Sequence, residues 1–459
     1  MKDSSTEIIL SLIEGQKSFF ASQQTRSYHF RIEQLKRFKS AILKYEKRIA
    51  EALWDDLHKS YEEAFLTEMS LVTQEIDNHI AHLSGWLKPK KVSTPIHLQP
   101  SSSYILTEPL GVALIIAPWN YPFQLLMNPL VGAISAGCCA LLKPSPYTPA
   151  VAKVMEELIT ETFEPAFVAM VQGGRGVNAF LLSHRFDIIF YTGSPAVGKV
   201  VMKAAAEYLT PVVLELGGKS PCIVDQSANI DVAAKRIVFG KTINAGQTCI
   251  APDYLFVHEK VKKELFERLA FYIEAVFGKN IRESQYYPRI VNRQAMERLT
   301  AYLGDGKVVF GAQFDMDERY IAPTLLDEVK FDSPVMQEEI FGPILPAITF
   351  TDIDEVVRYV NQHEKPLAFY YFGDESSGWK VFGQTTSGGG CINDTLMHIV
   401  NHQLPFGGVG NSGLGKYHGR ESFLAFSNRR AVVSTPTWID LPFKYVPFKY
   451  FGFVKKLLG

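Results

Sequence analysis

One cysteine of the chain lies in a polar, glycine-bearing segment that reads NAGQTCIAPD over residues 244–253. A cysteine thiolate attacks carbonyl carbon, and a helix N-terminus or nearby hydrogen-bond donors can lower the thiol pKa enough for that attack. Most free cysteines are instead small buried hydrophobic residues, and this is the role we expect for Cys138, Cys139 and Cys222, in or beside apolar runs. The polar surroundings of Cys249 favour a nucleophile.

Two further residues have side chains that suit the same chemistry. Glu215 ends the apolar run VVLE, where desolvation would raise the pKa of its carboxyl group towards neutrality, as a general base requires. The alternative is that strand alternation turns it to solvent. Asn120, in APWNYPF, follows a strand-like run, and its amide could donate to an oxyanion or could simply form a turn. The residues alone leave both alternatives open.

Other residues could hold a phosphate-bearing cofactor. The segment FYTGSPAVGK places Gly193 and Gly198 between a strand and a helix, where the backbone can approach a phosphate near the positive end of the helix dipole. The spacing is not GxGxxG, and the glycines could merely shape the turn. Lys143 ends CALLK and could reach a ribose or simply be solvated. Glu339 is a second candidate carboxylate, although Glu338 beside it also fits an acidic helix end.

The bulk properties are those of an ordinary globular protein. The 459 residues are too many for one hydrophobic core, so we expect two domains or more. A formal net charge of -1 lacks the basic excess that nucleic-acid binding needs. Five cysteines, two of them adjacent, do not form a disulfide framework, and no Cys/His cluster indicates a metal site. Neither a secretory signal nor a membrane-spanning run is evident, so we expect a cytoplasmic protein.

Hydrophobic periodicity divides the chain into regions. Residues 5 to about 87 predict helices, because apolar positions recur every three to four residues. From Gly111 onward, short apolar runs alternate with amphipathic stretches, which predicts a parallel sheet with helices on both faces. A second alternating stretch begins near Cys222, with strands expected around Val308, Thr324 and Phe369. Ligands of such sheets bind at the carboxyl ends of the strands.

The motifs together resemble the aldehyde dehydrogenase superfamily. PWNYP, TGSPAVG, LELGGKSP, GQTCIAPD, EEIFGP and PFGGVGNSG occur in the family's order and with roughly its separations, over nearly the whole chain. The short N-terminus and the form GQTCIAPDY are similar to the class 3 branch, which handles fatty and aromatic aldehydes, and suggest a bacterial member.

The resemblance implies an α/β fold with a Rossmann-type cofactor domain, an α/β catalytic domain and a small β oligomerisation arm. We expect these to comprise residues 1–91 and 108–216 (NAD(P)-binding domain with N-terminal helices), 217–387 (catalytic domain), 92–107 and 388–430 (oligomerisation arm), and 431–459 (aromatic and basic C-terminal tail).

The resemblance also implies the catalytic roles. Cys249 matches the nucleophile, Glu215 the general base and Asn120 the side-chain oxyanion donor, whose partner is the Cys249 backbone N–H. The thiolate adds to the aldehyde, the thiohemiacetal gives up hydride to the oxidised nicotinamide, and Glu215 activates the water that hydrolyses the thioester. The implied function is NAD(P)-dependent oxidation of an aldehyde, medium- or long-chain aliphatic or aromatic, to the carboxylic acid.

The cofactor residues follow from the same resemblance. Lys143 matches the lysine that holds the adenosine ribose. Gly193, Ser194 and Gly198 belong to the loop over the pyrophosphate, and Glu339 and Phe341 contact the nicotinamide ribose. Many family members read KPSE where this chain reads KPSP over residues 143–146, so less negative charge opposes a 2′-phosphate. We therefore expect NADP to be accepted alongside NAD.

Three alternatives stay open at this point. An acylating dehydrogenase would pass the thioester to coenzyme A, but such enzymes usually lack the glutamate found here at position 215. A thiol hydrolase or acyltransferase would need a histidine partner, and the nearest in sequence, His258, falls in an expected strand. A catalytically silent cofactor-binding protein has no need of intact Cys249, Glu215 and Asn120.

Partners are the least defined feature. Class 3 relatives imply a homodimer. The C-terminal tail interleaves aromatic residues with four lysines, and could touch a membrane surface weakly. We prefer packing on the subunit or its dimer mate, because the two PFKY units contain prolines that oppose a continuous amphipathic helix. Candidate substrate contacts are Tyr61, Trp119 and Tyr121, each of which could also be an ordinary core residue.

Overall fold

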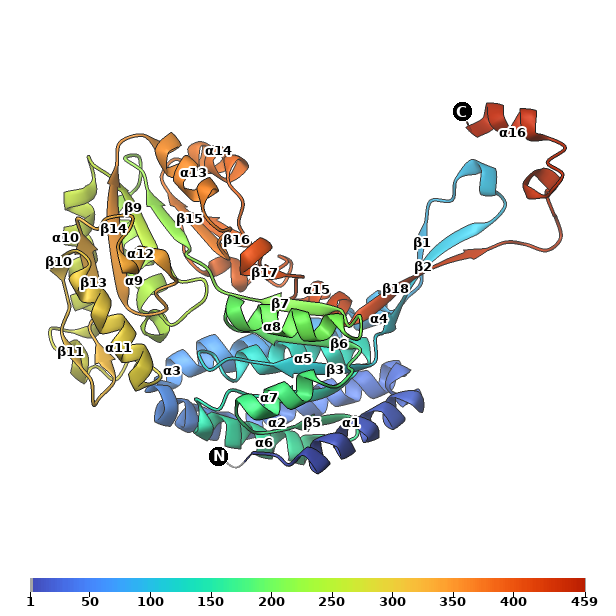
Figure 1. The fold of residues 1–459 in the computed structure, drawn as a ribbon, viewed down its shortest axis with the longest axis horizontal. Coiled ribbons are helices and arrows are strands. Elements are labelled where there is room, and N and C mark those ends of the chain that lie inside the picture. Colours follow the sequence, from blue (N-terminus) through green and yellow to red (C-terminus); the bar gives the residue numbers. More distant parts are fainter. Residues whose placement is uncertain (1–2, 459) are drawn as a thin grey trace.

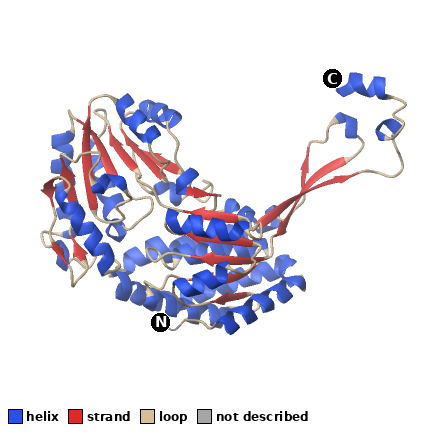
Figure 2. Ribbon diagram, viewed as in Figure 1, coloured by secondary structure: helices blue, strands red, loops and turns tan. Residues whose placement is uncertain are grey.

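Four β-sheets and their helices organise residues 3–458, the part of the chain that this computed structural model describes. Figure 1 shows two α/β bodies joined at the middle of the chain and a long arm that leaves one of them. Figure 2 shows helices packed around the strands of both bodies, whereas the arm is mostly strand and loop. The alternation of strands and helices predicted from Gly111 onward is confirmed.

The N-terminal region is helical, as its periodicity predicts. Its helices are α1 (Thr6–Ala21), α2 (Tyr28–Leu57), α3 (Tyr61–Ala64) and α4 (Ser70–Trp86). Ser5, Ser27 and Ser60 begin three of these helices, because each serine hydroxyl accepts a hydrogen bond from a backbone N–H of the first turn. The apolar faces of α1, α2 and α4 are buried against the first α/β body.

The first body is built on a six-stranded sheet with the order β17-β7-β6-β3-β4-β5. The strands are β3 (Val112–Ile116), β4 (Cys139–Lys143), β5 (Val168–Met170), β6 (Ile188–Thr192), β7 (Val212–Glu215) and β17 (Gly413–Leu414). All neighbours are parallel except β17, which pairs antiparallel with β7. The connecting helices are α5 (Gln124–Ala136), α6 (Pro149–Thr162), α7 (Arg175–Leu182) and α8 (Pro195–Ala206).

The second body is built on a seven-stranded sheet with the order β10-β13-β14-β9-β8-β15-β16. The strands are β8 (Pro221–Val224), β9 (Tyr254–His258), β10 (Lys307–Phe310), β13 (Thr324–Asp327), β14 (Ile344–Phe350), β15 (Ala368–Phe372) and β16 (Gly389–Ile392). Its helices are α9 (Ile230–Thr242), α10 (Lys262–Phe277), α11 (Arg293–Ala301), α12 (Pro334–Gln337), α13 (Ile353–Gln362) and α14 (Glu375–Gln384), and a two-stranded ribbon pairs β11 (Phe314–Asp315) with β12 (Tyr320–Ile321). The strands expected around Val308, Thr324 and Phe369 are confirmed.

The arm is a three-stranded antiparallel sheet. It consists of β1 (Lys90–Val92), β2 (Ser102–Pro109) and β18 (Ser427–Ser434), with β2 in the middle. The segment 388–430 therefore does not lie wholly in the arm. Residues 389–392 form an edge strand of the seven-stranded sheet and 413–414 join the six-stranded sheet, because the backbone groups of β15 and β7 are open for pairing there. Helix α15 (Arg420–Ala425) precedes β18.

The C-terminal tail lies beyond the far end of the arm (Figure 1). Its final helix, α16 (Phe451–Leu458), begins only after the two PFKY units. Trp438 is 77% exposed and Phe451 is 64% exposed, so the aromatic side chains do not pack on the body of their own subunit. None of the helices within residues 3–458 combines the length and the apolar composition that a bilayer crossing requires.

Candidate active site

The carboxyl ends of four adjacent parallel strands bring candidate residues to one edge of the six-stranded sheet. In the register of the sheet, Ile116 of β3 lies between Lys143 of β4 and Tyr191 of β6. Thr192, the last residue of β6, lies opposite Glu215 of β7. Asn120 follows β3 and Gly193 follows β6, so residues far apart in the sequence meet where α/β sheets bind ligands.

Cys249 lies in a tight loop that approaches this edge from the second body. The loop follows α9 and contains Asn244 and Ala245 with φ of 50° and 51° and Gly246 with φ of 72°. A Cβ on Gly246 would lie 2.3 Å from the carbonyl oxygen of Gly342, so only glycine fits there. The thiol side chain is half-buried.

Gln247 anchors the loop just before the cysteine. Its Nε2 donates to the carbonyl of Arg289 at 3.0 Å, and its Oε1 accepts from the N–H of Val291 at 2.9 Å. Thr248, next in the chain, pairs its hydroxyl with that of Tyr121 at 2.7 Å. These contacts fix the backbone on the N-terminal side of the thiol.

The amide of Asn120 is bound to the nucleophile loop. Its Nδ2 donates to the carbonyl of Gln247 at 3.0 Å, and the side chain is buried. Its Oδ1 has no hydrogen-bond partner within residues 3–458. An amide nitrogen carries two hydrogens, so one N–H is left to donate to an oxygen on a carbon attached to Cys249.

Two carboxyl groups lie close enough to the thiol to affect its pKa. Burial raises the pKa of the Cys249 thiol, and the negative charges of Glu339 and Glu215 raise it further. The sequence suggests that local groups lower the pKa of the thiol. In the structure this pKa is raised instead, because the effect of desolvation is larger than that of the backbone N–H groups. A raised pKa favours the protonated thiol, so attack by Cys249 requires a base that takes its proton.

Glu215 has the environment of such a base. It ends β7 in the interior, and neither carboxylate oxygen has a hydrogen-bond partner within the described residues. Burial raises the pKa of Glu215 well above its usual range, while the ammonium group of Lys416 lowers it in part. The absence of a side chain on Gly407 leaves room for the carboxylate, since a Cβ there would lie 2.7 Å from its Oε1.

Glu339 and Phe341 lie just after α12. Burial raises the pKa of Glu339 to about 8. A Cβ on Gly217 would lie 2.0 Å from Glu339 Oε2, so the carboxylate rests against that glycine. The ring of Phe341 packs edge-on against Trp119, with centroids 5.4 Å apart. Glu338, in contrast, is exposed, so the two neighbouring glutamates differ in their exposure to solvent.

Comparison with known proteins identifies the family. Residues 2–432 match the model of the "Aldehyde dehydrogenase family". The chain belongs to the aldehyde dehydrogenase family. The class 3-like membership and the α/β fold expected from the motifs are confirmed by the relatives and by a solved structure.

Two relatives and one solved structure illustrate the similarity. This aldehyde dehydrogenase is 49% identical to "4,4'-diaponeurosporen-aldehyde dehydrogenase" of Staphylococcus aureus, over 94% of this chain and 95% of that protein. It is 43% identical to "Aldehyde dehydrogenase, dimeric NADP-preferring" of Mus musculus, over 92% and 94%. The structure of the substrate-bound state of Staphylococcus aureus AldH has a TM-score of 0.96 and 47% identity, covering 98% and 99% of the chains.

The chain is thus an NAD(P)-dependent aldehyde dehydrogenase, which oxidises an aldehyde to the carboxylic acid. The residues at the strand ends fit a dinucleotide. Lys143 is buried, its amino group donates to the carbonyl of Pro144 at 2.7 Å, and burial lowers the pKa of Lys143 to about 8. One oxygen of Glu339 also has no hydrogen-bond partner within the described chain. Buried polar groups of this kind suit a polar ligand.

The junction between β6 and α8 presents the N-terminus of a helix at the edge of the sheet. The hydroxyl of Ser194 caps α8 by accepting from the N–H of Val197 at 3.4 Å. A Cβ on Gly193 would lie 2.2 Å from the hydroxyl of Tyr191, and one on Gly198 would lie 2.7 Å from Leu216. Both glycines are therefore required for packing, and the exposed N-terminus of α8 suits an anion.

Two motif residues that the sequence leaves without a role join the segment after Cys249 to the segment of Glu339 and Phe341 in the aldehyde dehydrogenase. Lys219 of LELGGKSP donates to Asp253 Oδ2 of GQTCIAPD at 2.6 Å and to the carbonyl of Glu338 at 3.1 Å. Asp253 Oδ1 accepts from the N–H of Ile340 at 2.8 Å. The pair therefore fixes the segment of Glu339 and Phe341. Their place inside two motifs is the only sequence signal that could have identified them.

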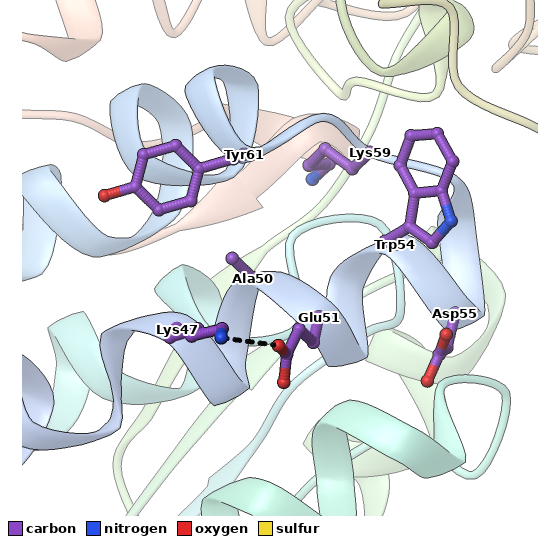
Figure 3. Close-up of a pocket in the computed structure, with 7 residues that line it drawn as sticks. All are labelled: Lys47, Ala50, Glu51, Trp54, Asp55, Lys59 and Tyr61. Atoms are coloured by element: carbon purple, nitrogen blue, oxygen red, sulfur yellow. Dashed lines mark ion pairs between the residues drawn. The ribbon is translucent and has the colours of Figure 1, made fainter. Parts of the chain in front are cut away.

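The three candidate substrate contacts lie in different surroundings. Tyr121 is buried against the nucleophile loop, and Trp119 packs on Phe341. Tyr61 is 51% exposed and lies at an open surface pocket over α2, together with Trp54 and Lys47 (Figure 3). The residues that line this pocket do not include Cys249, Asn120 or Glu215. The structure therefore separates Tyr61 from the other two candidates.

Proposed function

We propose that Cys249, Asn120 and Glu215 perform the chemistry of this aldehyde dehydrogenase. The observation that carries the proposal is that a thiol, a free amide N–H and an unpaired buried carboxylate converge from three separate segments. Glu215 takes the thiol proton, the Cys249 sulfur bonds to the aldehyde carbon, and the Asn120 amide donates to the resulting oxyanion. The bound nicotinamide cofactor supplies the hydride acceptor.

The second half of the reaction uses the same carboxylate. After the thioester has formed on Cys249, Glu215 takes a proton from water, and the hydroxide attacks the thioester carbon. The bond between carbon and sulfur breaks, the acid leaves, and the thiol is restored. Since nothing pairs with Glu215 among the described residues, its carboxylate is available for both proton transfers.

We further propose that Lys143, Gly193, Ser194, Gly198, Glu339 and Phe341 hold the cofactor. Lys143 and Glu339 would bind its two riboses, the β6–α8 junction would bind its pyrophosphate, and Phe341 would orient the nicotinamide side. Pro146 follows Ser145 where many relatives have a glutamate, so we expect NADP to be accepted as well as NAD. A specificity constant for NADP several orders of magnitude below that for NAD would contradict this.

The proposed substrates are medium- or long-chain aliphatic or aromatic aldehydes. The Staphylococcus aureus relative is named for the oxidation of 4,4'-diaponeurosporen-aldehyde. Trp119, Tyr121 and Phe341 supply aromatic surface next to the nucleophile loop, which suits an apolar chain. The proposed domains are those given by the sequence, except that the arm consists of the strands at 90–92, 102–109 and 427–434, while 389–392 and 413–414 belong to the two larger sheets.

We propose a homodimer, as in the relative named dimeric. The tail, whose Trp438 and Phe451 are exposed in one subunit, would pack on the dimer mate, and weak contact with a membrane surface is the alternative. We also propose a cytoplasmic location. Light scattering of the full chain and of a chain ending at residue 435, with and without anionic vesicles, separates these possibilities.

The decisive experiment follows reduced cofactor by its absorbance. A short aliphatic, a long aliphatic and an aromatic aldehyde are each tested with NAD and NADP, for the wild type and for Cys249→Ala. We expect reduced cofactor from the wild type only, with the long aliphatic or the aromatic aldehyde preferred. Turnover that requires coenzyme A would instead indicate an acylating enzyme, and equal rates with Cys249→Ala would remove Cys249 from the reaction.

A further inference from the structure

A cluster of charged residues lies behind the proposed oxyanion donor. We call Lys59, Glu63 and Glu68 the 59–68 brace; all three come from the connection between α2 and α4. Lys59 follows the left-handed residue His58 that ends α2, and Glu68 lies in a π-helical turn, η2 (Phe65–Met69). Isolated π-helical turns are rare in proteins, and many of those that occur lie at functional sites. The side chains of Lys59 and Glu68 are fully buried.

Lys59 and Glu68 hold the Asn120 segment at both of its ends. The Lys59 ammonium pairs with Glu68 Oε1 at 2.5 Å and donates to the backbone carbonyl of Asn120 at 3.3 Å. It also lies 4.3 Å from the ring centroid of Tyr121. Glu68 Oε2 accepts from the N–H groups of Phe123 at 2.9 Å and Gln124 at 3.2 Å, where α5 begins. The carboxylate thus caps a helix whose first residues follow Asn120 directly.

Glu63 extends the same brace to the nucleophile loop. Its Oε1 accepts from the backbone N–H of Asn244 at 2.7 Å. The side chain of Asn244 in turn donates to the carbonyl of Asn120 at 2.7 Å and to that of Gln247 at 3.0 Å. The carbonyl of Asn120 is therefore fixed from both sides, by Lys59 and by Asn244, before its side chain reaches Gln247.

We propose that Lys59, paired with Glu68, is a positioning residue that holds the Asn120 amide towards Cys249. The inference rests on the proposed role of Asn120. Neither residue reaches the nucleophile: Lys59 and Glu68 act through backbone groups of residues 120–124. A hydrogen-bond donor stabilises a developing oxyanion only if it is held within a few tenths of an ångström of the required position. The hydrogen bonds of this buried ion pair to residues 120–124 restrict where the Asn120 segment can lie.

The test compares Lys59→Met in two backgrounds. With Asn120 present, we expect Lys59→Met to slow the first turnover, measured as the burst of reduced cofactor, by about 10- to 100-fold, with little change in KM. With Asn120→Ala already present, we expect Lys59→Met to slow the burst by less than about threefold, because residues that act through one group are not additive. Equal slowing in both backgrounds would overturn the inference.

Loss of one member of a buried ion pair can destabilise a protein strongly. The double variant Lys59→Met/Glu68→Gln removes both charges of the ion pair and serves for the same comparison if Lys59→Met does not fold. Glu63 then loses the nearby charge of Lys59 but keeps its hydrogen bond from the backbone N–H of Asn244. The matched control is Arg31→Met. Arg31 is a buried cation that donates to the carbonyl of Thr25 and to that of Ser135, which lies near the C-terminal end of α5.

We expect Arg31→Met to lower the melting temperature while the burst rate stays within about twofold of the wild type. Slowing by Arg31→Met as large as that by Lys59→Met would show a general effect of instability and would overturn the inference. An unchanged burst in Asn120→Ala alone would instead refute the proposed function of Asn120, so the two failures are distinguishable.

Discussion

Two buried carboxylates of the first body differ in what surrounds them. Glu68 in the 59–68 brace pairs with Lys59 and accepts two backbone N–H groups. Glu215 at the catalytic edge has no partner for either oxygen within residues 3–458. A carboxylate whose hydrogen bonds are satisfied holds structure in place, whereas one that is buried without partners can exchange protons with whatever enters beside it.

Removing the catalytic carboxylate should have the largest effect on activity. We expect Glu215→Gln to slow steady-state turnover by about 10²- to 10⁴-fold, because it removes a general base. The burst is expected to fall less than steady-state turnover if the thiol proton can leave to water. Stopped-flow absorbance checks this, with Cys249→Ala as the control without a burst. Steady-state turnover within twofold of the wild type would exclude Glu215 as the base.

The same substitution should raise stability, which sharpens the contrast with Glu68. The folded protein keeps the proton of Glu215 well above the usual pKa of 4.5, while the unfolded chain releases it near that value. The folded state therefore binds more protons, and the free energy of unfolding falls as pH rises above about 4.5. Glu215→Gln should lack this loss, so its melting temperature should exceed that of the wild type at pH 7. An equal or lower melting temperature would argue against a raised pKa of Glu215 in the folded protein.

Truncating the oxyanion donor should have the next largest effect. We expect Asn120→Ala to slow turnover by about 10²- to 10³-fold and to leave the cofactor dissociation constant largely unchanged. Protein fluorescence measures the latter without turnover. Asn128→Ala is the control, because Asn128 is also buried and lies on the neighbouring helix α5. Unchanged turnover in Asn120→Ala would remove Asn120 from the mechanism.

Lys143 is the cationic counterpart of Glu215, since it is buried without a carboxylate partner in the described chain. Burial lowers the pKa of Lys143 from 10.5 to about 8. Below pH 8 Lys143 is protonated in both the folded and the unfolded chain, so the buried charge destabilises the folded protein in full. This destabilisation disappears as pH rises from 8 towards 10.5. We expect Lys143→Met to stabilise the protein at pH 7 by at most about 3 kcal/mol and to weaken cofactor binding.

Thermal melts across pH 6 to 10 and cofactor titrations check both effects of Lys143→Met. The stability gain should shrink as pH rises through the window between the two pKa values. The exposed Lys153 on α6 provides the control Lys153→Met, which should change neither quantity. Stabilisation that stays constant to pH 10 would contradict a charged, buried Lys143.

The sequence predicts the edge of the sheet far better than the brace. Glu215 and Lys143 end apolar runs. In a parallel sheet all such ends lie on one side, so the alternation of strands and helices predicts that both residues lie on the same edge of the sheet. Lys59 and Glu68 show no comparable pattern. They lie among ordinary helical charges, and their partners at residues 120–124 lie more than 50 positions away in sequence. Only tertiary packing reveals that these charges are buried.

The glutamates at 338 and 339 show another limit of sequence analysis. Periodicity does not distinguish them, because a short helix ends just before both. The structure separates them through Asp253, which binds the N–H of Ile340 and turns Glu339 inward. The segment 388–430 shows the same limit. Its pairing with β15 and β7, which the sequence does not predict, places parts of it in the two larger sheets.

The smallest expected effect concerns Lys416, a cation near the proposed base Glu215. Lys416 donates to the carbonyl of Gly388 at 3.3 Å, and its charge lowers the pKa of Glu215 against the effect of burial. Lys416→Met should therefore raise the pKa of Glu215, and the acidic limb of the kcat profile should move to higher pH by about one unit. The thiol of Cys249 and the phenol of Tyr417 also lie near Glu215 and are unchanged in this variant.

Lys365→Met, which removes an exposed cation near Gly410, should leave the profile in place. A shift to lower pH, or none, would mean that Lys416 supports the loop without acting on the base. That result would leave Glu215 with no charged neighbour that acts on it, which is the clearest form of its contrast with Glu68.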